Sequence, residues 1–143
     1  MNATRHDPRL VCPACANGKL VRETRTARYE YRGEILDYEQ SGDWCSSCEE
    51  AVLTGDDMAA TEELLLDFMR QVEQRQAGEL ARIRRKLKLT QKQAAALTGG
   101  GHNAFSRYER GEARPLPAIM HLFRILDRHP ELLDELREGR KAG

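Results

Sequence analysis

The 143-residue sequence contains no run of about 18 apolar residues, the length that indicates a transmembrane helix. The opening segment, residues 1–10, is polar and lacks the apolar stretch of a secretory signal peptide. We therefore expect a cytoplasmic protein, whose thiols stay reduced. No internal repeat or low-complexity tract stands out, so nothing indicates a repeat architecture.

The chain also lacks a net charge, because 23 Lys and Arg residues balance 23 Asp and Glu residues. This balance hides two opposite halves. Residues 1–78 hold nine basic and fifteen acidic residues, a net of −6, whereas residues 79–143 hold fourteen and eight, a net of +6. A basic half suits a polyanion such as DNA, and an acidic half suits a basic protein partner. Chance clustering of solvated charges would give the same counts, so charge alone does not decide the function.

Four cysteines form two Cys-x-x-Cys pairs separated by 29 residues: Cys12 with Cys15, and Cys45 with Cys48. Each pair places two thiolates on one tight turn, and a hairpin that joins the turns supplies the tetrahedral sulfur set that zinc prefers. Because four protein ligands leave no open position, we predict a structural zinc ion that supports a small core. Two alternatives stay open, a redox dithiol, which would leave one pair unexplained, and an iron–sulfur centre.

The first half of the chain is predicted to be a small zinc-ribbon-like domain over residues 1–76, with residues 1–10 as a tail. Apolar and polar residues alternate in three short runs around a turn at residues 32–34, which predicts a three-stranded antiparallel sheet over 20–23, 27–31 and 35–38. An apolar stripe at helical spacing then predicts a helix over about 57–75 that packs on the sheet. Gly78 is the expected flexible junction.

The second half, residues 77–143, is predicted to be an all-α domain of five helices, so the fold class is α+β. Leu80, Ile83 and Leu87 mark the first helix, and Thr90 with Gln93 forms a capping box that opens the second. Residues 99–101 are all glycine and break the chain before a third helix over about 103–110, which ends at Gly111. Pro117 and Pro130 each suit the first turn of a further helix.

The second and third predicted helices have the spacing of a helix-turn-helix. Phe105 and Tyr108 fall on one side of the third helix, and the other side is polar. Asparagine can bond N6 and N7 of adenine, and arginine can fork onto O6 and N7 of guanine, so we predict base contacts from Asn103 and Arg107. Phosphate and further DNA contacts are predicted from the rest of this surface: Ser106, Arg110, Thr90, Gln91 and Lys92.

Two further observations qualify this interpretation. Glu109 would repel phosphate if it were exposed on the DNA side, so we expect it to pair with an arginine inside the domain. A polar solvated helix in a bundle that binds no DNA is the alternative reading of the same residues, although the cap, the glycine turn and the basic surroundings together favour DNA.

The motifs of an enzyme are missing. We find no nucleophile with an adjacent base, no phosphate-binding loop and no open metal site, so no catalytic activity is expected. His129-Pro130-Glu131 matches the H-x-E of zinc deaminases, but it follows both cysteine pairs and starts a predicted helix, where Pro and Glu are ordinary residues. We interpret this match as accidental.

The sequence resembles the MqsA-type antitoxins, whose helix-turn-helix belongs to the Cro and lambda-repressor class. The resemblance runs from Val11 to Arg137. It includes both cysteine pairs with the Cys48-Glu49-Glu50 segment. The most specific matching stretches are residues 88–92, 99–101, 103–109 and 127–133.

This resemblance implies an antitoxin of a type II toxin-antitoxin system, with a zinc domain that binds an mRNA-cleaving toxin. It also implies a helix-turn-helix domain that dimerises and represses its own operon by reading a palindromic operator. The family's base contacts fall on Asn103 and Arg107, and its zinc ligands on Cys12, Cys15, Cys45 and Cys48. A different hypothesis is a stand-alone zinc-containing transcriptional regulator whose first half senses redox state or metal.

Overall fold

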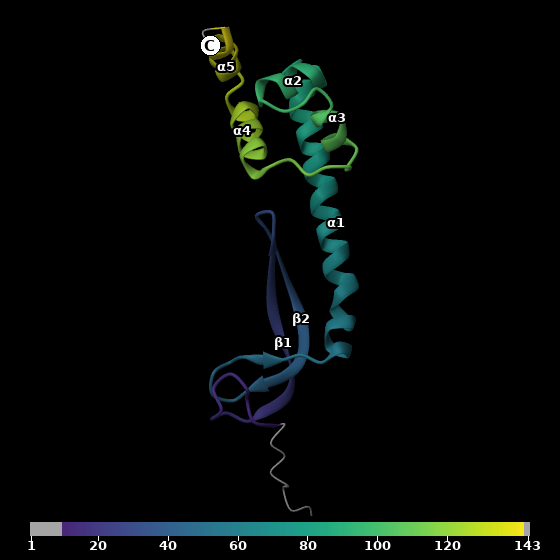
Figure 1. Ribbon diagram of the computed structural model, residues 1–143, viewed down its shortest axis with the longest axis vertical. Helices are drawn as coiled ribbons and strands as arrows, with labels where there is room; N and C mark the ends of the chain where they lie inside the picture. The colour runs from purple at the N-terminus through teal and green to yellow at the C-terminus, as the bar shows by residue number, and fades with distance from the viewer. Residues whose placement is uncertain (1–9, 142–143) are drawn as a thin grey trace, which may run out of the picture. The chain divides into compact units, whose positions relative to one another are not determined.

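A computed structural model describes residues 10–141 and divides the chain into two compact units, Met1–Phe68 and Met69–Gly143. The predicted tail covers residues 1–10, of which 1–9 lie outside the described residues. Between residues 10 and 141, no helix has both the length and the hydropathy needed to cross a membrane. The two units are built differently, the first around a β-sheet and the second from helices, as the α+β class requires (Figure 1).

The sheet of the first unit is a long hairpin with a short third strand. β1 (Leu20–Tyr31) pairs antiparallel with β2 (Glu34–Cys45), and β2 pairs with β3 (Ala51–Val52), in the order β1-β2-β3. The hairpin turns at Arg32 and Gly33, whose φ angles of 51° and 83° are both left-handed. Two left-handed residues match the twist of the flanking strands, so the predicted turn is confirmed.

The three strands are not those predicted from the alternation. The predicted strands 20–23 and 27–31 are one continuous strand, the predicted strand 35–38 is part of β2, and the third strand comes later, at residues 51–52. The polar residues that seemed to interrupt β1 bond across the hairpin instead. The Thr24 and Ser41 hydroxyls lie 2.7 Å apart, and the Thr26 hydroxyl donates to Glu39 at 2.7 Å. Cross-strand pairs of this kind stabilise a solvated sheet face, so polarity did not mark a strand end.

One long helix, α1 (Gly55–Lys86), follows the sheet. Its start is fixed by two reciprocal bonds, because the Asp57 N–H donates to the Thr54 hydroxyl at 3.2 Å and the Thr54 N–H donates to the Asp57 carboxylate at 2.9 Å. Asp57 is buried and also accepts from the Arg22 guanidinium of β1, 2.8 Å from Nη1. Further along, the Phe68 ring meets Tyr29 edge to face at 6.2 Å. These contacts hold the beginning of α1 on the hairpin.

The prediction of a helix ending near residue 75 and a flexible junction at Gly78 was wrong, because α1 runs through both positions. A glycine inside a helix costs roughly 1 kcal/mol relative to alanine. Val72, Leu80 and Ile83 are all fully buried, and this burial outweighs the local cost. The division into units falls between Phe68 and Met69, earlier in the helix than the predicted boundary between residues 76 and 77.

The second unit packs the remainder of α1 with four shorter helices, α2 (Gln91–Leu97), α3 (Ala104–Glu109), α4 (Pro117–Arg128) and α5 (Leu132–Lys141). Its core is one continuous apolar cluster centred on Phe105, whose ring lies 5.2 Å from that of Phe123. Full burial of one such side chain is worth roughly 1.5–3 kcal/mol. The predicted features at Pro117 and Gly111 are confirmed: the proline lies in the first turn of α4, and the glycine has a φ of +74° just after α3.

Candidate metal centre and nucleic-acid interface

The four cysteines come together at the base of the hairpin. Their Sγ atoms all lie within 4.8 Å of one another. Cys12 Sγ is 3.6 Å from Cys48 Sγ, and Cys15 Sγ is 3.7 Å from Cys45 Sγ, so each close contact joins one cysteine of each pair. Four sulfurs at about 2.3 Å from a tetrahedral zinc ion are about 3.8 Å apart. The set therefore has the dimensions of a zinc tetrathiolate, and a multi-iron cluster needs more room.

Backbone hydrogen bonds hold the two cysteine turns against each other. In the first turn, the Cys12 N–H donates to the Gly18 carbonyl at 3.0 Å. The second turn begins at Cys45, the last residue of β2. Between the turns, the Ser46 N–H donates to the Lys19 carbonyl at 3.0 Å, and the Lys19 N–H donates back to the Ser46 hydroxyl at 3.0 Å. The ligand geometry is thus set by the fold of the chain around the site.

Backbone donors in these turns favour the thiolate form that metals require at Cys15 and Cys45, whereas burial and the hydrogen bonds with neighbouring cysteines raise the pKa of Cys48 to about 12. The N–H groups of Ser47 and Cys48 point at Cys45 Sγ, at 3.3 and 3.4 Å, and these backbone donors hold the pKa of Cys45 below its ordinary value. Donation from the backbone of Asn17 and Gly18 lowers the pKa of Cys15 to about 6. A hydrogen bond to a charged sulfur stabilises the charge, so two of the four ligands are prepared for metal.

Gly18 is a functional residue of this centre that the sequence analysis missed. A β-carbon at position 18 would overlap the Cys45 sulfur, and it would also stand 3.1 Å from the Ser47 side chain. Only glycine leaves room for the second turn to close over the first. The available signal was a glycine three positions after Cys15, which has no meaning without knowledge of what approaches it.

All four ligand positions of this centre are filled by protein side chains. Cys12 and Cys45 are buried, and Cys15 and Cys48 are half-buried. A closed tetrahedral site keeps no coordination position for water or substrate, so the chemistry that it supports is structural. Binding of the metal there contributes directly to the folding free energy of the small sheet.

The second candidate site is the α2-turn-α3 segment. The predicted capping box at its start is confirmed, because the Gln93 N–H donates to the Thr90 hydroxyl at 3.1 Å and the Thr90 N–H donates to Gln93 Oε1 at 2.9 Å. Gln91 is half-buried and Lys92 is exposed. This first turn of α2 therefore presents an ammonium group and free backbone donors to solvent.

α3 has one buried side and one polar side, as predicted. Phe105 is fully buried, and its ring meets that of Tyr108 at 5.5 Å. α2 approaches closely because Ala94 and Ala95, both fully buried, have small side chains. The turn between the helices is tight as well, since Gly99 has a φ of +72° and a β-carbon at Gly100 would stand 3.2 Å from Ala104. The aromatic rings of α3 and the alanines of α2 pack the inner side of α3 into the core, and the outer side of α3 is left facing solvent.

Asn103 occupies the N-cap of α3, yet its side chain makes no capping hydrogen bond. Asparagine is strongly preferred at this position because its side chain usually accepts a hydrogen bond from the helix backbone. The exposed Asn103 carboxamide makes no such bond and can bind another group. Arg107, one turn later, is exposed, and in the described part of the chain its guanidinium has no ion-pair partner. Two planar hydrogen-bonding groups thus face solvent on α3, one from its N-cap and one from its last turn.

The other predicted contact residues of α3 are less free. Ser106 is half-buried, and Arg110 is exposed but forms an ion pair with Glu112 at 3.1 Å and donates to the Ser106 carbonyl at 3.3 Å. An exposed pair of this kind is worth little and exchanges readily. Arg110 is therefore available to a phosphate once Glu112 is released.

Glu109 pairs with an arginine inside the domain, as predicted. Its carboxylate accepts from Arg84 of α1 at 2.7 and 2.8 Å. The sequence alone does not single out Arg84 as the partner, because Arg84 is one of five basic residues between positions 82 and 88. The fold separates Arg84 from its neighbours by burying it.

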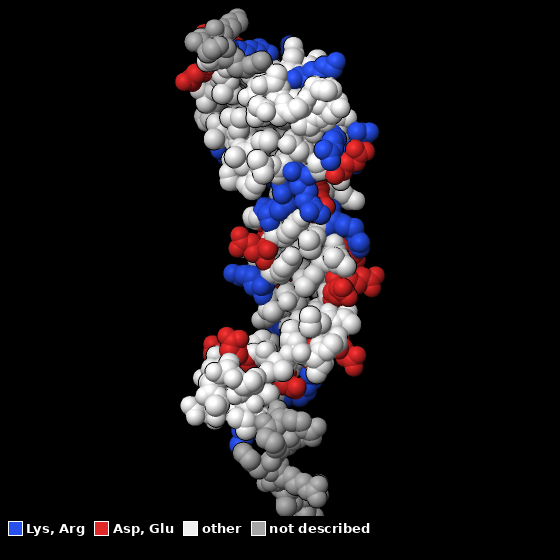
Figure 2. Space-filling view, in the orientation of Figure 1, with Lys and Arg blue, Asp and Glu red and all other residues white. Residues whose placement is uncertain are grey.

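Charges of both signs intermix on the visible face of the protein (Figure 2). Several basic side chains of the second unit are already paired, as in Arg82 with Asp127, Arg124 with Glu79 and Arg114 with Glu73. The first two pairs lie within residues 79–143 and are already subtracted in the net charge of +6, so of these three carboxylates only Glu73, from outside this range, offsets part of that charge.

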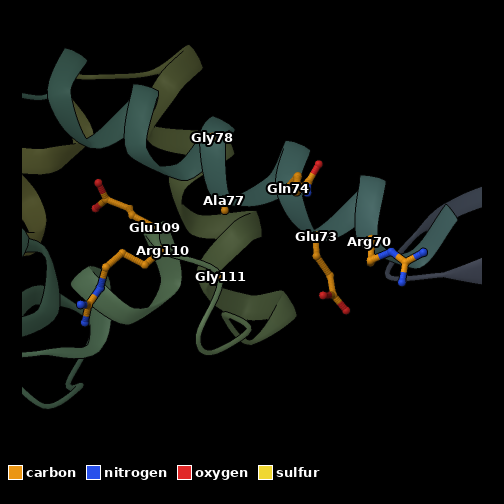
Figure 3. A pocket seen from close by; sticks show the side chains of 8 residues that line it. All are labelled: Arg70, Glu73, Gln74, Ala77, Gly78, Glu109, Arg110 and Gly111. Atoms are coloured by element: carbon orange, nitrogen blue, oxygen red, sulfur yellow. The ribbon is translucent and has the colours of Figure 1, made fainter. Parts of the chain in front are cut away.

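The second unit also has an open pocket of about 410 Å³ between α1 and the end of α3 (Figure 3). Three of its charged lining residues are engaged elsewhere: Glu109 with Arg84, Arg110 with Glu112, and Glu73 with Arg114. Gly78 and Gly111 contribute bare backbone to the wall. This pocket presents no concentrated charge to a ligand, and we assign it no function.

Comparison with known proteins gives two matches of nearly full length. A family described as the antitoxin component of a bacterial toxin-antitoxin system, MqsA, matches residues 10–137. Antitoxin MqsA of Escherichia coli (strain K12) is 38% identical over 138 residues, which span 90% of this chain and 100% of that relative.

Proposed function

The chain belongs to the MqsA antitoxin family, and from this premise we propose that it is the antitoxin of a type II toxin-antitoxin system and the repressor of its own operon. The zinc-binding domain, residues 1–76, neutralises an mRNA-cleaving toxin. The helix-turn-helix domain, residues 77–143, dimerises and binds a palindromic operator. The protein acts by binding and carries out no catalysis.

The observation that supports DNA binding most directly is that the Asn103 side chain, at the N-cap of α3, makes no capping hydrogen bond. A helix N-cap that does not cap leaves its amide donor and acceptor free at the end of the helix that enters the major groove. Asn103 then reads an adenine and Arg107 a guanine, each pair discriminating by about 1–3 kcal/mol. The buried Phe105 ring keeps this face turned outward.

The phosphate contacts come from the start of α2 and the end of α3. Thr90, Gln91 and Lys92 contact one side of the backbone, and Ser106 and Arg110 the other. Such contacts set the orientation of the protein on the duplex and make binding sensitive to salt. In a homodimer, two copies of α3 read half-sites separated by about 34 Å or a multiple of it.

The toxin-binding part is supported by the charge of the first half of the chain. Residues 1–78 carry a net charge of −6. An enzyme that cleaves mRNA needs a basic surface for its substrate, and an acidic partner is attracted to the same surface. The zinc centre contributes rigidity, because it joins the two turns at the base of the hairpin.

A mobility-shift titration tests the operator contacts. The probes are the duplex directly upstream of the gene and a shuffled duplex of the same length and composition. The doubly substituted Asn103→Ala, Arg107→Ala protein is expected to lose the preference for the upstream duplex and to retain weak, salt-sensitive binding. Arg137→Ala, which removes an exposed charge from α5, is the matched control and keeps the preference. An unchanged preference in the double variant contradicts the assignment.

Co-purification tests the toxin. The tagged full-length chain, expressed with its neighbouring gene, is expected to retain that gene's product and to suppress its cleavage of mRNA in vitro. A stand-alone regulator would retain no such product. If DNA binding were also lost reversibly on mild oxidation while the protein stayed folded, the sensing hypothesis would replace the antitoxin one.

A further inference from the structure

Three parts of the DNA-binding segment meet at Arg84, near the end of α1. Its guanidinium donates from Nε and Nη2 to the two carboxylate oxygens of Glu109, and from Nη1 to the Leu89 carbonyl at 2.9 Å. The Arg84 backbone carbonyl in turn accepts from the Leu89 N–H at 3.1 Å. One residue thus binds the α1–α2 turn through its main chain and side chain, and binds α3 through its side chain.

Arg84 bonds to Leu89 and Glu109, which adjoin residues of the two segments predicted to contact DNA. Leu89 is directly before Thr90, where the phosphate-contacting turn begins, and it is buried at 3% exposure. Glu109 is the last residue of α3 and lies two positions after Arg107. A bidentate guanidinium–carboxylate pair fixes both distance and orientation, because both groups are planar. The tie therefore limits how α3 can rotate or slide against the start of α2.

Arg84 and Glu109 are themselves too buried to contact DNA. Their side chains are 12% and 9% exposed. The charges neutralise each other, so neither adds to the attraction for phosphate. Any effect of this pair on DNA binding must pass through the position of other residues.

We propose that Arg84 and Glu109 are positioning residues for operator reading, which set the spacing between the phosphate-contacting turn at Thr90 and the base-reading face of α3. With the Arg84–Glu109 ion pair intact, the phosphate contacts and the base contacts form on one duplex at the same time. Without the pair, the phosphate contacts still form, but α3 is no longer held at the distance at which its side chains meet the operator bases. This inference rests on the proposed function, since it concerns how the same surface discriminates between sequences.

A second ion pair on the same helix provides the control. Arg124 of α4 donates to both carboxylate oxygens of Glu79 of α1, at 2.9 and 2.9 Å. The chemistry matches that of the Arg84–Glu109 pair, and the two side chains are 36% and 30% exposed. This pair joins α1 to α4 rather than α1 to α3. Its loss affects stability without changing the relation between α2 and α3.

The experiment compares full-length wild type with Glu109→Gln, Arg84→Lys, Glu79→Gln and Asn103→Ala. For each, the dissociation constant is measured for the upstream duplex and for the shuffled duplex, and thermal unfolding is followed by circular dichroism. Glu109→Gln and Arg84→Lys are expected to lower the ratio of the two affinities about tenfold, the effect of losing one good base contact. Binding to the shuffled duplex and its salt dependence stay unchanged, because no phosphate contact is removed. Glu79→Gln leaves the ratio as in wild type.

The possible results distinguish failure of the positioning role from failure of the proposed DNA-binding function. If Glu109→Gln and Arg84→Lys melt earlier but keep the wild-type ratio, the pair is only structural and the inference is overturned. If wild type itself shows no preference for the upstream duplex, or Asn103→Ala keeps the full wild-type ratio of affinities, the proposed function falls and the inference falls with it. Should Glu109→Gln fail to fold, Arg84→Lys decides, because lysine keeps the charge opposite Glu109 and cannot reach Leu89 at the same time.

Discussion

The Sγ atoms of Cys12 and Cys48 lie 3.6 Å apart, although 36 positions separate the two residues in the sequence. β1 and β2 create this proximity, because their pairing returns the chain from the hairpin tip to Leu20 and Cys45, which are direct partners. A single ion bound at this point cross-links the two ends of the hairpin. Metal binding therefore adds to the folding free energy of the sheet, and a change in one should be measurable as a change in the other.

Removal of zinc should unfold the base of the hairpin. Trp44, the single tryptophan, lies beside Cys45 with the Arg25 guanidinium carbon 4.8 Å from the centre of its ring. Chelation at neutral pH is expected to change the Trp44 fluorescence and release one zinc ion per chain, which a colorimetric dye counts. The core around Phe105 stays folded, so DNA binding persists. Loss of DNA binding with the hairpin still folded would favour the sensing hypothesis instead.

Substitution of Gly18 by alanine should weaken the metal centre without touching a ligand. The new β-carbon would overlap the Cys45 sulfur, so the second turn must shift. We expect a loss of about 1–3 kcal/mol in folding free energy, typical of overpacking, and faster zinc release to a chelator. Gly55→Ala is the control, because a β-carbon there meets no described atom within 4 Å. Equal zinc release rates in the two variants would contradict this account of Gly18.

Substitution of Gly78 by alanine should stabilise the protein. Gly78 lies inside α1, and an added β-carbon meets no described atom within 4 Å. Alanine is favoured over glycine in a helix by about 1 kcal/mol, and denaturant unfolding should show a gain of up to this size. Gly99→Ala, at a φ of +72°, should destabilise instead. A loss of stability in Gly78→Ala would mean that α1 bends at this position in solution.

Acid should destabilise the first unit through Asp57. The Arg22 guanidinium and the Thr54 backbone N–H hold the pKa of Asp57 well below its ordinary value. A depressed pKa in the folded state stabilises the fold above the unfolded-state pKa of about 3.9, and this contribution is lost as the pH falls below it. Melting temperatures between about pH 3 and pH 6 should therefore fall less steeply for Asp57→Asn than for wild type. Asp56→Asn, which removes the exposed neighbouring carboxylate, is the matched control for the loss of one negative charge.

Local patterns allowed correct predictions wherever the decisive partners are close in the sequence. The hairpin turn at Arg32 and Gly33, the capping box of Thr90 and the glycine after α3 each depend on a few neighbouring residues. The predictions failed where distant contacts decide. The polar stretch of β1 looked like a break because its cross-strand partners on β2 were unknown, and Gly78 looked like a junction because burial of Leu80 could not be weighed against it.

By itself, the sequence determined the chemical groups and their local spacing: two pairs of thiolates on short turns, and a short helix with rings on one side and Asn103 and Arg107 on the other. Tertiary structure alone decided which cysteines face each other, that Gly18 must lack a side chain, and that Arg84 is the partner of Glu109. The physical reason is the separation in sequence between the residues that interact. Helix caps and turns depend on bonds between near neighbours, whereas metal geometry and buried ion pairs depend on how distant segments pack.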